Sequence, residues 1–423
     1  MQRLIPSETA LVFGGGGAKG AYEVGVMEAL ASLGVHAGHT YGASAGALNA
    51  ALYAQGATAK AADLWENLLL SDVVTPESVA LAEEAETLFS RPEKILDFIA
   101  RNAQKKGIDT APLLALIRAS VDEDVLRRSS VHFGLVVTRF PSLSKVEKRL
   151  QDIPSGALHD WLLASCSCFP VFPMKAIDDQ RYIDGGFSDN VPVEMAIRAG
   201  ARHIIAVDIG RSRAHSQYDR RPNVTYIRAS QPLGGLLTFD PQRARENRIL
   251  GYHDTLRAFG RLRGTCYSFD SIDAQRLQDR AQDFILHLTQ FEADMSRKND
   301  APLFALLEEE LRPGADAVDY FLRACELCAQ ALDVNPAQLL TFSKLVDALH
   351  AALPLGKADV MLDSLLGGRI GVLFAPPQPD RKVVLACLYR LLKREGSFSP
   401  LAMRTLCAFP RELLCALTLC AVL

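Results

Sequence analysis

The sequence lacks any apolar run long enough to cross a bilayer. Its most apolar segment, residues 413–423, is well short of the ~20 residues that a membrane-spanning helix needs. The N-terminal residues, 1–6, contain no long apolar run before a cleavage site, so we expect no signal peptide. These two absences predict a cytoplasmic protein that contacts a membrane only peripherally.

The sequence also lacks a large excess of charge of either sign. It has 46 Lys and Arg against 49 Asp and Glu, which gives a formal net charge of -3 at pH 7. A protein that binds nucleic acid needs a basic surface to contact the phosphate backbone. We therefore expect no nucleic-acid partner.

Clusters of metal-ligating residues are missing as well. The nine cysteines are scattered along the chain, and Cys325 and Cys328 form a C-x-x-C. No second cysteine pair and no histidine cluster at zinc spacing accompanies them, so buried thiols are favoured over a metal site. Since no ligand cluster occurs elsewhere, we expect neither a metal nor an organic cofactor.

At 423 residues the chain is longer than one typical domain, so two regions are expected. Strand-like apolar runs alternate with helical patterns up to residue 270, and beyond it the patterns are helical. The run His203–Ile209 is continuously apolar in its core, which is typical of a parallel strand covered on both faces. We predict an α/β fold with a mainly parallel sheet for residues 1–270, followed by an all-α region of unknown role for residues 271–423.

A glycine-rich loop follows the first apolar strand. Residues 14–20 read GGGGAKG, and a helical pattern comes directly after them. Their G-x-G-x-x-G spacing matches a dinucleotide-binding fingerprint, which also requires an acidic residue about 20 positions further on. The second strand region, residues 33–41, contains no Asp or Glu, so that interpretation is disfavoured. We predict instead that backbone N–H groups of the loop bind a developing oxyanion.

A G-x-S-x-G motif follows the second strand. Gly42 and Gly46 flank Ser44, and the apolar helical run 47–54 comes directly after. This pattern is typical of a serine held on a tight strand-to-helix turn, where a side chain at either glycine would block the turn or the helix packing. We predict that the Ser44 hydroxyl projects from that turn, with a helix N-terminus behind it.

An Asp-Gly-Gly sequence, Asp184 to Gly186, follows a short strand much later in the chain. An Asp-Gly pair most often forms a turn in which the carboxylate bonds its own backbone. The two glycines also let the carboxylate approach another group closely. Taken alone, these residues leave both interpretations open.

A Ser-His-Asp triad is the alternative within acyl transfer. His203 and His253 follow Asp184, an order that α/β-hydrolases use. Ser44, however, comes after about two strands, whereas an α/β-hydrolase builds more of its sheet before the nucleophile. His203 also begins an apolar strand and His253 lies in a predicted helix, so the triad is disfavoured.

In this order, the three motifs resemble those of the patatin-like phospholipases, over roughly residues 8–265. That family has G-G-G-x-[K/R]-G, then G-x-S-x-G, then D-G-[G/A]. The contexts Pro170-x-x-Pro173 and Asp189-Asn190-x-Pro192 also look like the family. The resemblance implies a three-layer α/β/α patatin-like fold for the first region and nothing about the helical extension.

The resemblance also implies a Ser–Asp dyad. Ser44 would be the nucleophile, and Asp184 would accept or orient its proton. Partial burial would help by raising the pKa of Asp184 above its usual value of about 3.9. The oxyanion hole would consist of the backbone N–H groups of Gly15, Gly16 and Gly17. The positions that support the motifs are Lys19, Gly20, Gly42, Gly46, Gly185 and Gly186.

The expected function is that of a serine lipid acyl hydrolase, of the phospholipase A or lysophospholipase type. It would release fatty acid from a phospholipid or another acyl-ester lipid during transient contact with a membrane surface. The alternative is a lipid-binding regulatory protein of the same fold, either catalytically silent or activated by an unidentified partner. Residues 71–110 also leave two interpretations open, surface helices that cover the sheet or a mobile lid over an acyl pocket.

Overall fold

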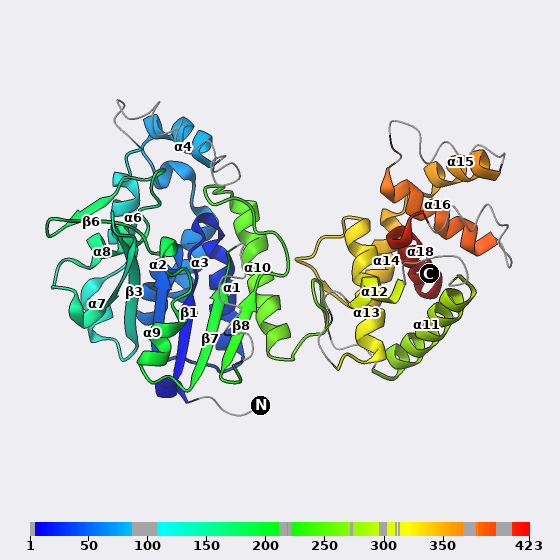
Figure 1. The fold of residues 1–423 in the computed structure, drawn as a ribbon, viewed down its shortest axis with the longest axis horizontal. Coiled ribbons are helices and arrows are strands. Elements are labelled where there is room, and N and C mark those ends of the chain that lie inside the picture. The colour runs from blue at the N-terminus through cyan, green and yellow to red at the C-terminus, as the bar shows by residue number, and fades with distance from the viewer. Residues whose placement is uncertain are drawn as a thin grey trace. The chain divides into compact units, whose positions relative to one another are not determined.

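The chain forms two compact units (Figure 1). A computed structural model describes residues 5–86, 108–210, 218, 221–270, 274–295, 303–308, 311, 314–366, 378, 380–394 and 408–423. The first unit ends at Phe259 and the second begins at Gly260. The boundary expected from the sequence, between residues 270 and 271, lies a short way beyond this division.

An eight-stranded sheet, mostly parallel, forms the centre of the first unit. Its strands are β1 (Thr9–Phe13), β2 (His39–Ala43), β3 (His132–Phe140), β4 (Ser144–Arg149), β5 (Lys175–Ile177), β6 (Gln180–Asp184), β7 (His203–Asp208) and β8 (Val224–Arg228). They run in the order β5-β6-β3-β2-β1-β7-β8, and β4 also pairs with β3. The β3, β2, β1, β7 and β8 strands are parallel, whereas β4, β5 and β6 pair antiparallel. The carboxyl ends of the parallel strands therefore share one edge of the sheet.

Helices cover both faces of this sheet, as the sequence predicted. They are α1 (Ala21–Ser32), α2 (Ala45–Ala54), α3 (Thr58–Asn67), α4 (Val79–Glu86), α6 (Ala111–Ser120), α7 (Glu123–Arg128), α8 (Leu158–Ser165), α9 (Val193–Arg198) and α10 (Pro241–Ala258). On one face, Met195 of α9 joins a buried core with Val12 and Tyr41. On the other face lies α2, because Gly42, which alternates with Tyr41 along β2, faces the backbone of Gly46 in α2.

Helix α10 comes late in the sequence but packs against α1, near the N-terminus (Figure 1). Two glycines permit this contact. A Cβ at Gly25 would lie 1.8 Å from the Arg248 carbonyl oxygen, and a Cβ at Gly251 would lie 1.9 Å from the Tyr22 carbonyl oxygen. The Tyr22 hydroxyl also donates to the Asp254 carboxylate, with an O–O distance of 2.7 Å. This pairing fixes the helix that follows the glycine loop.

The described residues of the second unit are helical apart from one short strand pair. Its elements are β9 (Ser268–Phe269), α11 (Ala274–Met295), α12 (Leu303–Glu308), α13 (Ala317–Ala331), β10 (Leu339–Leu340), α14 (Phe342–Ala352), α15 (Leu355–Leu366), α16 (Arg381–Arg394) and α18 (Pro410–Val422). Cys325 and Cys328 are free thiols buried in its core, which agrees with the preference for buried thiols. Within the described part of the chain, no helix is both long and apolar enough to cross a membrane.

A buried glutamate organises the start of this unit. Glu326 of α13 is fully buried, and its Oε1 accepts hydrogen bonds from the backbone N–H groups of Thr265, Cys266 and Tyr267. The three N–O distances are 2.6, 2.9 and 3.0 Å. Its Oε2 accepts from the Thr265 hydroxyl and, at 3.3 Å, from the Arg323 guanidinium. One carboxylate thus fixes the turn before β9 to the middle of α13.

Replacing Glu326 with alanine should destabilise the second unit by about 3–5 kcal/mol, since it leaves backbone donors and a buried arginine without their acceptor. The matched control is Asp347→Ala on α14, an exposed acidic residue that should change the free energy of unfolding by less than about 0.5 kcal/mol. Unfolding by guanidinium chloride is followed by far-UV circular dichroism. Tryptophan fluorescence reports separately on the first unit, because Trp65 and Trp161 both lie there. A loss below about 1 kcal/mol for Glu326→Ala would contradict this account of the turn.

Most elements expected from the sequence are present, with small shifts at their ends. The apolar run of residues 131–138, VHFGLVVT, predicts a buried strand, and it forms β3. Residues 224–228, which the sequence suggests as an edge strand, form β8. The helical pattern over residues 336–353 forms a helix only from Phe342, because the residues before it pair as β10 with β9. The lid interpretation of residues 71–110 falls largely on residues 87–107, which lie outside the described residues.

Candidate active site

Strand β3 brings together two segments that are far apart in the sequence. Its residues 134–136 pair with both β2 and β4, and its residues 137–139 pair with both β4 and β6. One edge of β3 therefore carries β4, while the other carries β2 and then β6, end to end. Ala43 of β2 and Asp184 of β6 pair with consecutive residues of β3. Ser44, which follows Ala43, consequently lies next to Asp184.

Ser44 occupies the tight turn between β2 and α2. Its backbone has φ 54° and ψ -130°, a conformation that costs a residue with a side chain about 1–3 kcal/mol. The Ser44 N–H donates to the Ser165 hydroxyl at 2.9 Å, and that hydroxyl donates to the Val136 carbonyl oxygen at 2.7 Å. The turn is thus held in place by β3 and α8, with the partly exposed Ser44 at the N-terminus of α2.

Asp184 lies at the end of β6 and is 5% exposed. Its Oδ1 accepts a hydrogen bond from the Gly186 N–H at 2.7 Å, and the Ser44 hydroxyl is within hydrogen-bonding reach of the same carboxylate. The Asp184 N–H donates to the Ser167 carbonyl oxygen, and its own carbonyl oxygen accepts from the Thr138 hydroxyl, both at 2.8 Å. The two interpretations of the Asp-Gly-Gly sequence therefore hold together, because the carboxylate closes its own turn and also faces the serine.

Burial raises the pKa of Asp184 from 3.8 to about 6, while the hydrogen bonds from Ser44 and Gly186 oppose this rise. A carboxylate with this pKa is a stronger base than a solvated aspartate, yet it remains ionised at neutral pH. The pair can therefore move a proton from a hydroxyl to a carboxylate.

The glycine loop after β1 passes directly beside this pair. A Cβ at Gly15 would lie 3.1 Å from the Cβ of Ser44. Gly17 has a φ of +57°, and a Cβ there would lie 2.2 Å from the carbonyl oxygen of Leu236, so a side chain is excluded at this position. The loop can approach the serine closely because it has no side chains in the way.

The three predicted oxyanion donors differ in their hydrogen bonding. The Gly15 N–H donates to the Asn190 carbonyl oxygen at 3.1 Å. The N–H groups of Gly16 and Gly17 donate to no other residue that the structure describes. In this conformation Gly16 and Gly17 are available to bind an anion, whereas the Gly15 N–H is already engaged.

Asn190, to which the sequence analysis assigned no role, links the glycine loop to the turn that carries Asp184. Its side-chain amide donates to the Gly15 carbonyl oxygen at 3.2 Å, which complements the bond from the Gly15 N–H. A Cβ at Gly15 or Gly186 would lie 2.6 or 2.7 Å from the Asn190 Oδ1. Two motif glycines therefore make room for this amide. The Asp189-Asn190-x-Pro192 context was the sequence signal that pointed to it.

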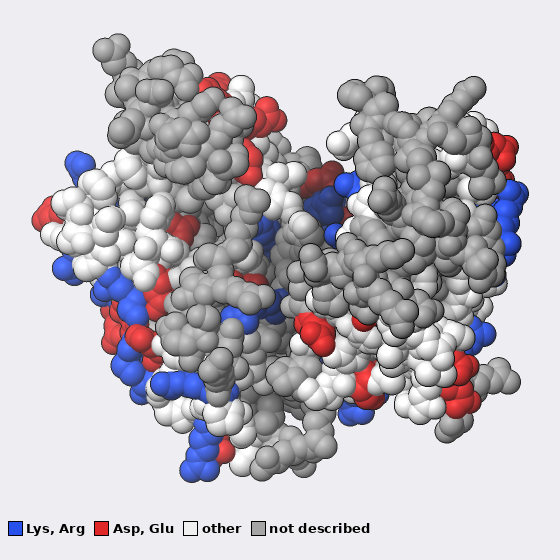
Figure 2. Space-filling model, turned by 45° about the vertical axis from the view of Figure 1, so that its right-hand side comes forward, with Lys and Arg blue, Asp and Glu red and all other residues white. Residues whose placement is uncertain are grey.

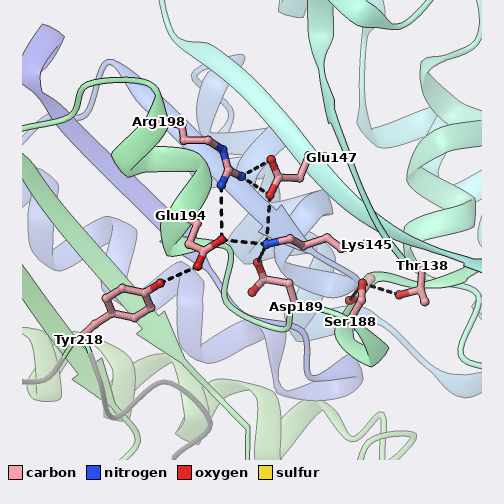
Figure 3. Close-up of polar contacts among 9 residues, drawn as sticks. Thr138, Lys145, Glu147, Ser188, Asp189, Glu194, Arg198 and Tyr218 are labelled. Carbon is pink, nitrogen blue, oxygen red and sulfur yellow. Dashed lines mark hydrogen bonds and ion pairs between the residues drawn. The ribbon is translucent and has the colours of Figure 1, made fainter. Parts of the chain in front are cut away.

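A network of ion pairs and hydrogen bonds holds the other side of the turn that follows Asp184 (Figure 3). Its members are Lys145, Glu147, Asp189, Glu194, Arg198 and Tyr218. The Lys145 ammonium lies 3.0 Å from the buried carboxylate of Asp189, which directly precedes Asn190. The Thr138 and Ser188 hydroxyls, 2.8 Å apart, add a link to β3. The turn after Asp184 is thus fastened to β3, β4 and α9 as well as to the glycine loop.

We expect Asn190→Ala to lower kcat for ester hydrolysis by about 10- to 100-fold with a smaller change in KM. The reason is that Asn190 no longer holds the glycine loop in its position relative to Ser44 and Asp184. Asn190→Asp, which keeps the size but not the amide donor, should show most of this loss. Asn223→Ala is the control, since Asn223 is an exposed asparagine beside β8. The measurement is kcat and KM of each variant and of the wild type on a soluble acyl ester, from steady-state kinetics. A change confined to KM would mean that Asn190 contacts substrate instead of positioning the loop.

An apolar cavity of about 250 Å³ opens onto these groups. Ser44, Asp184 and Gly15 to Gly17 form part of its wall. The rest is mainly aliphatic and aromatic and includes Leu48, Trp65, Leu68, Val73, Leu113, Leu116, Phe172, Leu236, Leu237 and Phe239. A cavity with this lining fits an apolar chain placed next to the serine.

The structure gives no support to the Ser-His-Asp triad. No histidine is among the described residues that line the cavity. His203 begins β7, at the amino end of the parallel strands, whereas Ser44 follows the carboxyl end of β2. His253 lies within α10 and is buried there.

Two cysteines that the sequence analysis did not connect with the site, Cys166 and Cys168, also line the cavity. Burial, together with the neighbouring Asp184 carboxylate, raises the pKa of both thiols. They remain protonated at neutral pH, so neither is suited to act as a nucleophile.

The other motif glycines allow close packing around the site. A Cβ at Gly20 would lie 2.3 Å from the ring of Trp65, and Lys19, beside it, is buried. A Cβ would also lie within 3 Å of a backbone carbonyl oxygen at three further positions, which are Gly42, Gly46 and Gly185. These contacts explain the glycines on either side of Ser44 and directly after Asp184.

Part of the first unit is similar in sequence to a known protein family. The family model described as Patatin-like phospholipase matches residues 11–197, a stretch that contains both Ser44 and Asp184. Residues 11–197 are similar to the patatin-like phospholipase family. The resemblance seen in the three motifs is thereby confirmed.

Relatives of this patatin-like domain are found within much longer proteins. The Patatin-like phospholipase domain-containing protein ZK370.4 of Caenorhabditis elegans is 30% identical over 223 residues, which are 51% of this chain and 14% of that protein. Lysophospholipase NTE1 of Mycosarcoma maydis is 24% identical over 221 residues, 49% of this chain and 10% of that protein. The chain therefore spans only a small part of the length of these relatives.

Among solved structures, that of VipD from Legionella pneumophila aligns with 100% of this chain and 91% of its own, at a TM-score of 0.40 and 14% identity.

Proposed function

We propose that this protein is a serine lipid acyl hydrolase of the phospholipase A or lysophospholipase type. The observation that carries the proposal is the meeting of Ser44 and the buried Asp184 at the wall of an apolar cavity. The N–H groups of Gly16 and Gly17 lie beside them and donate to no other described residue. A nucleophile, a base, anion donors and space for an apolar chain are the parts that acyl transfer from a lipid needs.

The proposed reaction proceeds through an acyl-serine intermediate. Asp184 accepts the hydroxyl proton as the Ser44 oxygen attacks the ester carbonyl carbon. The carbonyl oxygen becomes an oxyanion, which accepts hydrogen bonds from the Gly16 and Gly17 N–H groups, each worth about 3–4 kcal/mol by analogy with other acyl-transfer enzymes. The alcohol leaves with the proton from Asp184. A water molecule, deprotonated by Asp184, then attacks the acyl-serine, releases the fatty acid and regenerates Ser44.

The shape of the site supports a lipid acyl chain as the substrate group. The cavity wall beside Ser44 consists mainly of aliphatic and aromatic side chains, which favour an acyl chain over a sugar or a charged peptide. The proposed substrates are therefore phospholipids, lysophospholipids and related acyl esters. The proposed place of action is the cytoplasmic surface of a membrane, reached by transient contact.

Nucleic acid is not among the proposed partners. On the face shown in Figure 2, basic and acidic side chains of the described residues are interspersed instead of forming one basic surface. This pattern agrees with the near balance of charge in the sequence. The catalytic domain is proposed to be residues 1–270, and the role of the helical region stays open to experiment.

The test measures fatty acid released by the full chain from mixed phospholipid vesicles and from a soluble acyl ester. In parallel, the protein is treated with a fluorophosphonate probe and the adduct is mapped by mass spectrometry. We expect both substrates to be cleaved and the adduct to be on the peptide that contains Ser44, not on that containing Ser165. Cleavage of the soluble ester alone would mean that access to vesicles needs a lid opening or a partner.

The alternative, a regulatory lipid-binding protein of the same fold, makes a different prediction. If the probe labels Ser44 but neither substrate is cleaved, the site is competent and awaits an activating partner or another substrate. If neither the probe nor a substrate reacts, the protein is catalytically silent and the hydrolase proposal is wrong.

A further inference from the structure

We propose that the tip of the β3–β4 hairpin, residues 140–143, together with Phe187 forms the surface through which this protein contacts a lipid bilayer. This inference rests on the proposed function, because a hydrolase of membrane lipids must bring its cavity to the bilayer surface. It goes further by naming the residues that make the contact and the lipid charge that they favour.

Leu143, at the tip of the hairpin, is exposed and has an unfavourable backbone conformation. The residue is 57% exposed, and its backbone has a φ of 54°. A leucine with positive φ is strained, and an exposed leucine gains nothing from burial in the protein core. Asparagine or glycine at this position would relieve the strain and remove the exposed apolar surface. A leucine that is unfavourable in both respects is explained if its side chain is buried elsewhere, in a partner.

The cavity reaches the protein surface at Phe187, near the carboxyl end of β3 that leads into the hairpin. Phe187, which is 54% exposed, lies in the cavity wall two residues after the Asp-Gly pair. Its neighbour Ser188 contacts Thr138 of β3, two residues before Phe140, where the hairpin tip begins. The ring of Phe140 in turn lies 5.8 Å from that of Phe169. Phe187 at the cavity wall and the hairpin tip, residues 140–143, are thus both attached to the carboxyl end of β3.

The charges around this surface favour a bilayer with anionic lipids. Arg139, on β3, and Arg181, on β6, flank the tip, because Phe140 pairs with Arg181 across the two strands. Both arginines are exposed, and neither forms an ion pair with any residue that the structure describes. Near a membrane, such cations attract anionic headgroups, while leucine and phenylalanine enter the boundary of the acyl chains.

A bilayer explains these observations together. Phe187 lies in the wall of the cavity proposed to hold an acyl chain, so a bilayer that contacts Phe187 would bring its lipids next to that cavity. The two exposed arginines complement the phosphate groups that lie just above the acyl region of a membrane.

The experiment measures cosedimentation of the full chain with vesicles of phosphatidylcholine, with and without phosphatidylglycerol. All binding measurements use a Ser44→Ala background, so that the vesicles stay intact. The variants are Leu143→Asn and the double variant Arg139→Gln with Arg181→Gln. Leu286→Gln is the matched control, because Leu286 is 56% exposed but lies on α11, in the second unit.

We expect Leu143→Asn to weaken binding to both kinds of vesicle by about fivefold or more, because it removes an inserted apolar side chain. The double arginine variant should weaken binding to the anionic vesicles by a factor of about five or more and leave binding to phosphatidylcholine alone unchanged. Leu286→Gln should bind like the parent. With Ser44 present, Leu143→Asn should hydrolyse a soluble acyl ester at the normal rate, and its melting temperature should not fall.

Two results of the binding measurements would overturn the inference. One is no binding of the parent to either vesicle, and the other is binding that Leu143→Asn leaves unchanged. Failure of the proposed function looks different, because the wild type would then not hydrolyse the soluble ester, whatever its affinity for vesicles. A fall in melting temperature in Leu143→Asn would contradict the strain on which the argument depends.

Discussion

Ser44→Ala should lower kcat for ester hydrolysis by at least about 10⁴-fold, because none of the other described residues of the cavity wall is suited to replace the serine as nucleophile. The two nearby thiols, Cys166 and Cys168, are held protonated by burial and by the Asp184 carboxylate. Backbone donors and the cavity remain in the variant, so substrate binding should be nearly unchanged. Labelling by the fluorophosphonate should be lost together with activity.

A second substitution at Ser44 tests separately the loss of activity and the backbone strain at this position. Ser44→Gly should be as inactive as Ser44→Ala, yet more stable than it by about 1 kcal/mol, since glycine adopts φ 54° and ψ -130° without strain. The measurements are fatty acid release and the unfolding free energy of the three proteins in guanidinium chloride. Full activity in Ser44→Ala would refute the assignment of the nucleophile. Equal stability of the alanine and glycine variants would refute the strain at the turn.

Asp184→Asn should lower kcat by about 10³-fold or more, because the amide cannot accept the proton of the Ser44 hydroxyl. The wild-type protein should also lose activity in acid. Since burial raises the pKa of Asp184 to about 6, kcat/KM should fall about tenfold per pH unit below that value and level off above it. The residual activity of Asp184→Asn should lack this step.

The same substitution should stabilise the protein at neutral and alkaline pH. The pKa of Asp184 is about 6 in the folded protein and about 3.8 when solvated, so the folded state binds the proton more tightly. The stability contributed by this group is therefore fully present below about pH 4 and is lost as the pH rises through about 6. The difference corresponds to about 3 kcal/mol, and Asp184→Asn, which stays neutral, should recover up to this amount near pH 8.

Denaturation of wild type and Asp184→Asn at several pH values tests this prediction. The gain in free energy of unfolding should be largest near about pH 8 and should vanish below about pH 4. Asp178→Asn is a matched control in the same unit, because Asp178 is exposed in the turn between β5 and β6. A variant that is less stable than the wild type at every pH would show that the buried carboxylate supports the fold instead of opposing it.

Much of this site was accessible from the sequence because its parts are local motifs. The G-x-S-x-G pattern around Ser44 specifies its own turn, since backbone carbonyl groups lie too close for a side chain at Gly42 or Gly46. The glycine loop could likewise be recognised, and the absence of an acidic residue on the second strand separated it from a dinucleotide site. Asp184 by itself fitted two interpretations, and only its position beside β2 shows that both apply.

Other features depend on contacts between distant segments. The engagement of the Gly15 N–H by Asn190 requires the turn after Asp184 to lie on the glycine loop. The thiols of Cys166 and Cys168 enter the cavity wall because α8 ends beside Ser44. The Asp189-Asn190-x-Pro192 context pointed to Asn190 but not to the group that it binds. The position of the two thiols leaves no periodic pattern or motif in the chain, so local reasoning had no signal for it.

The sequence by itself determined the order of strand, glycine loop and helix, the turn at Ser44, the α/β class of the first unit and the helical character of the second. Each of these follows from backbone freedom at glycine or from the spacing of apolar residues along one segment. Only the tertiary structure decided that Ser44 meets Asp184, because β2 and β6 must first line up end to end along β3. It also decided the pKa of Asp184, since that value depends on burial by every segment that surrounds the carboxylate.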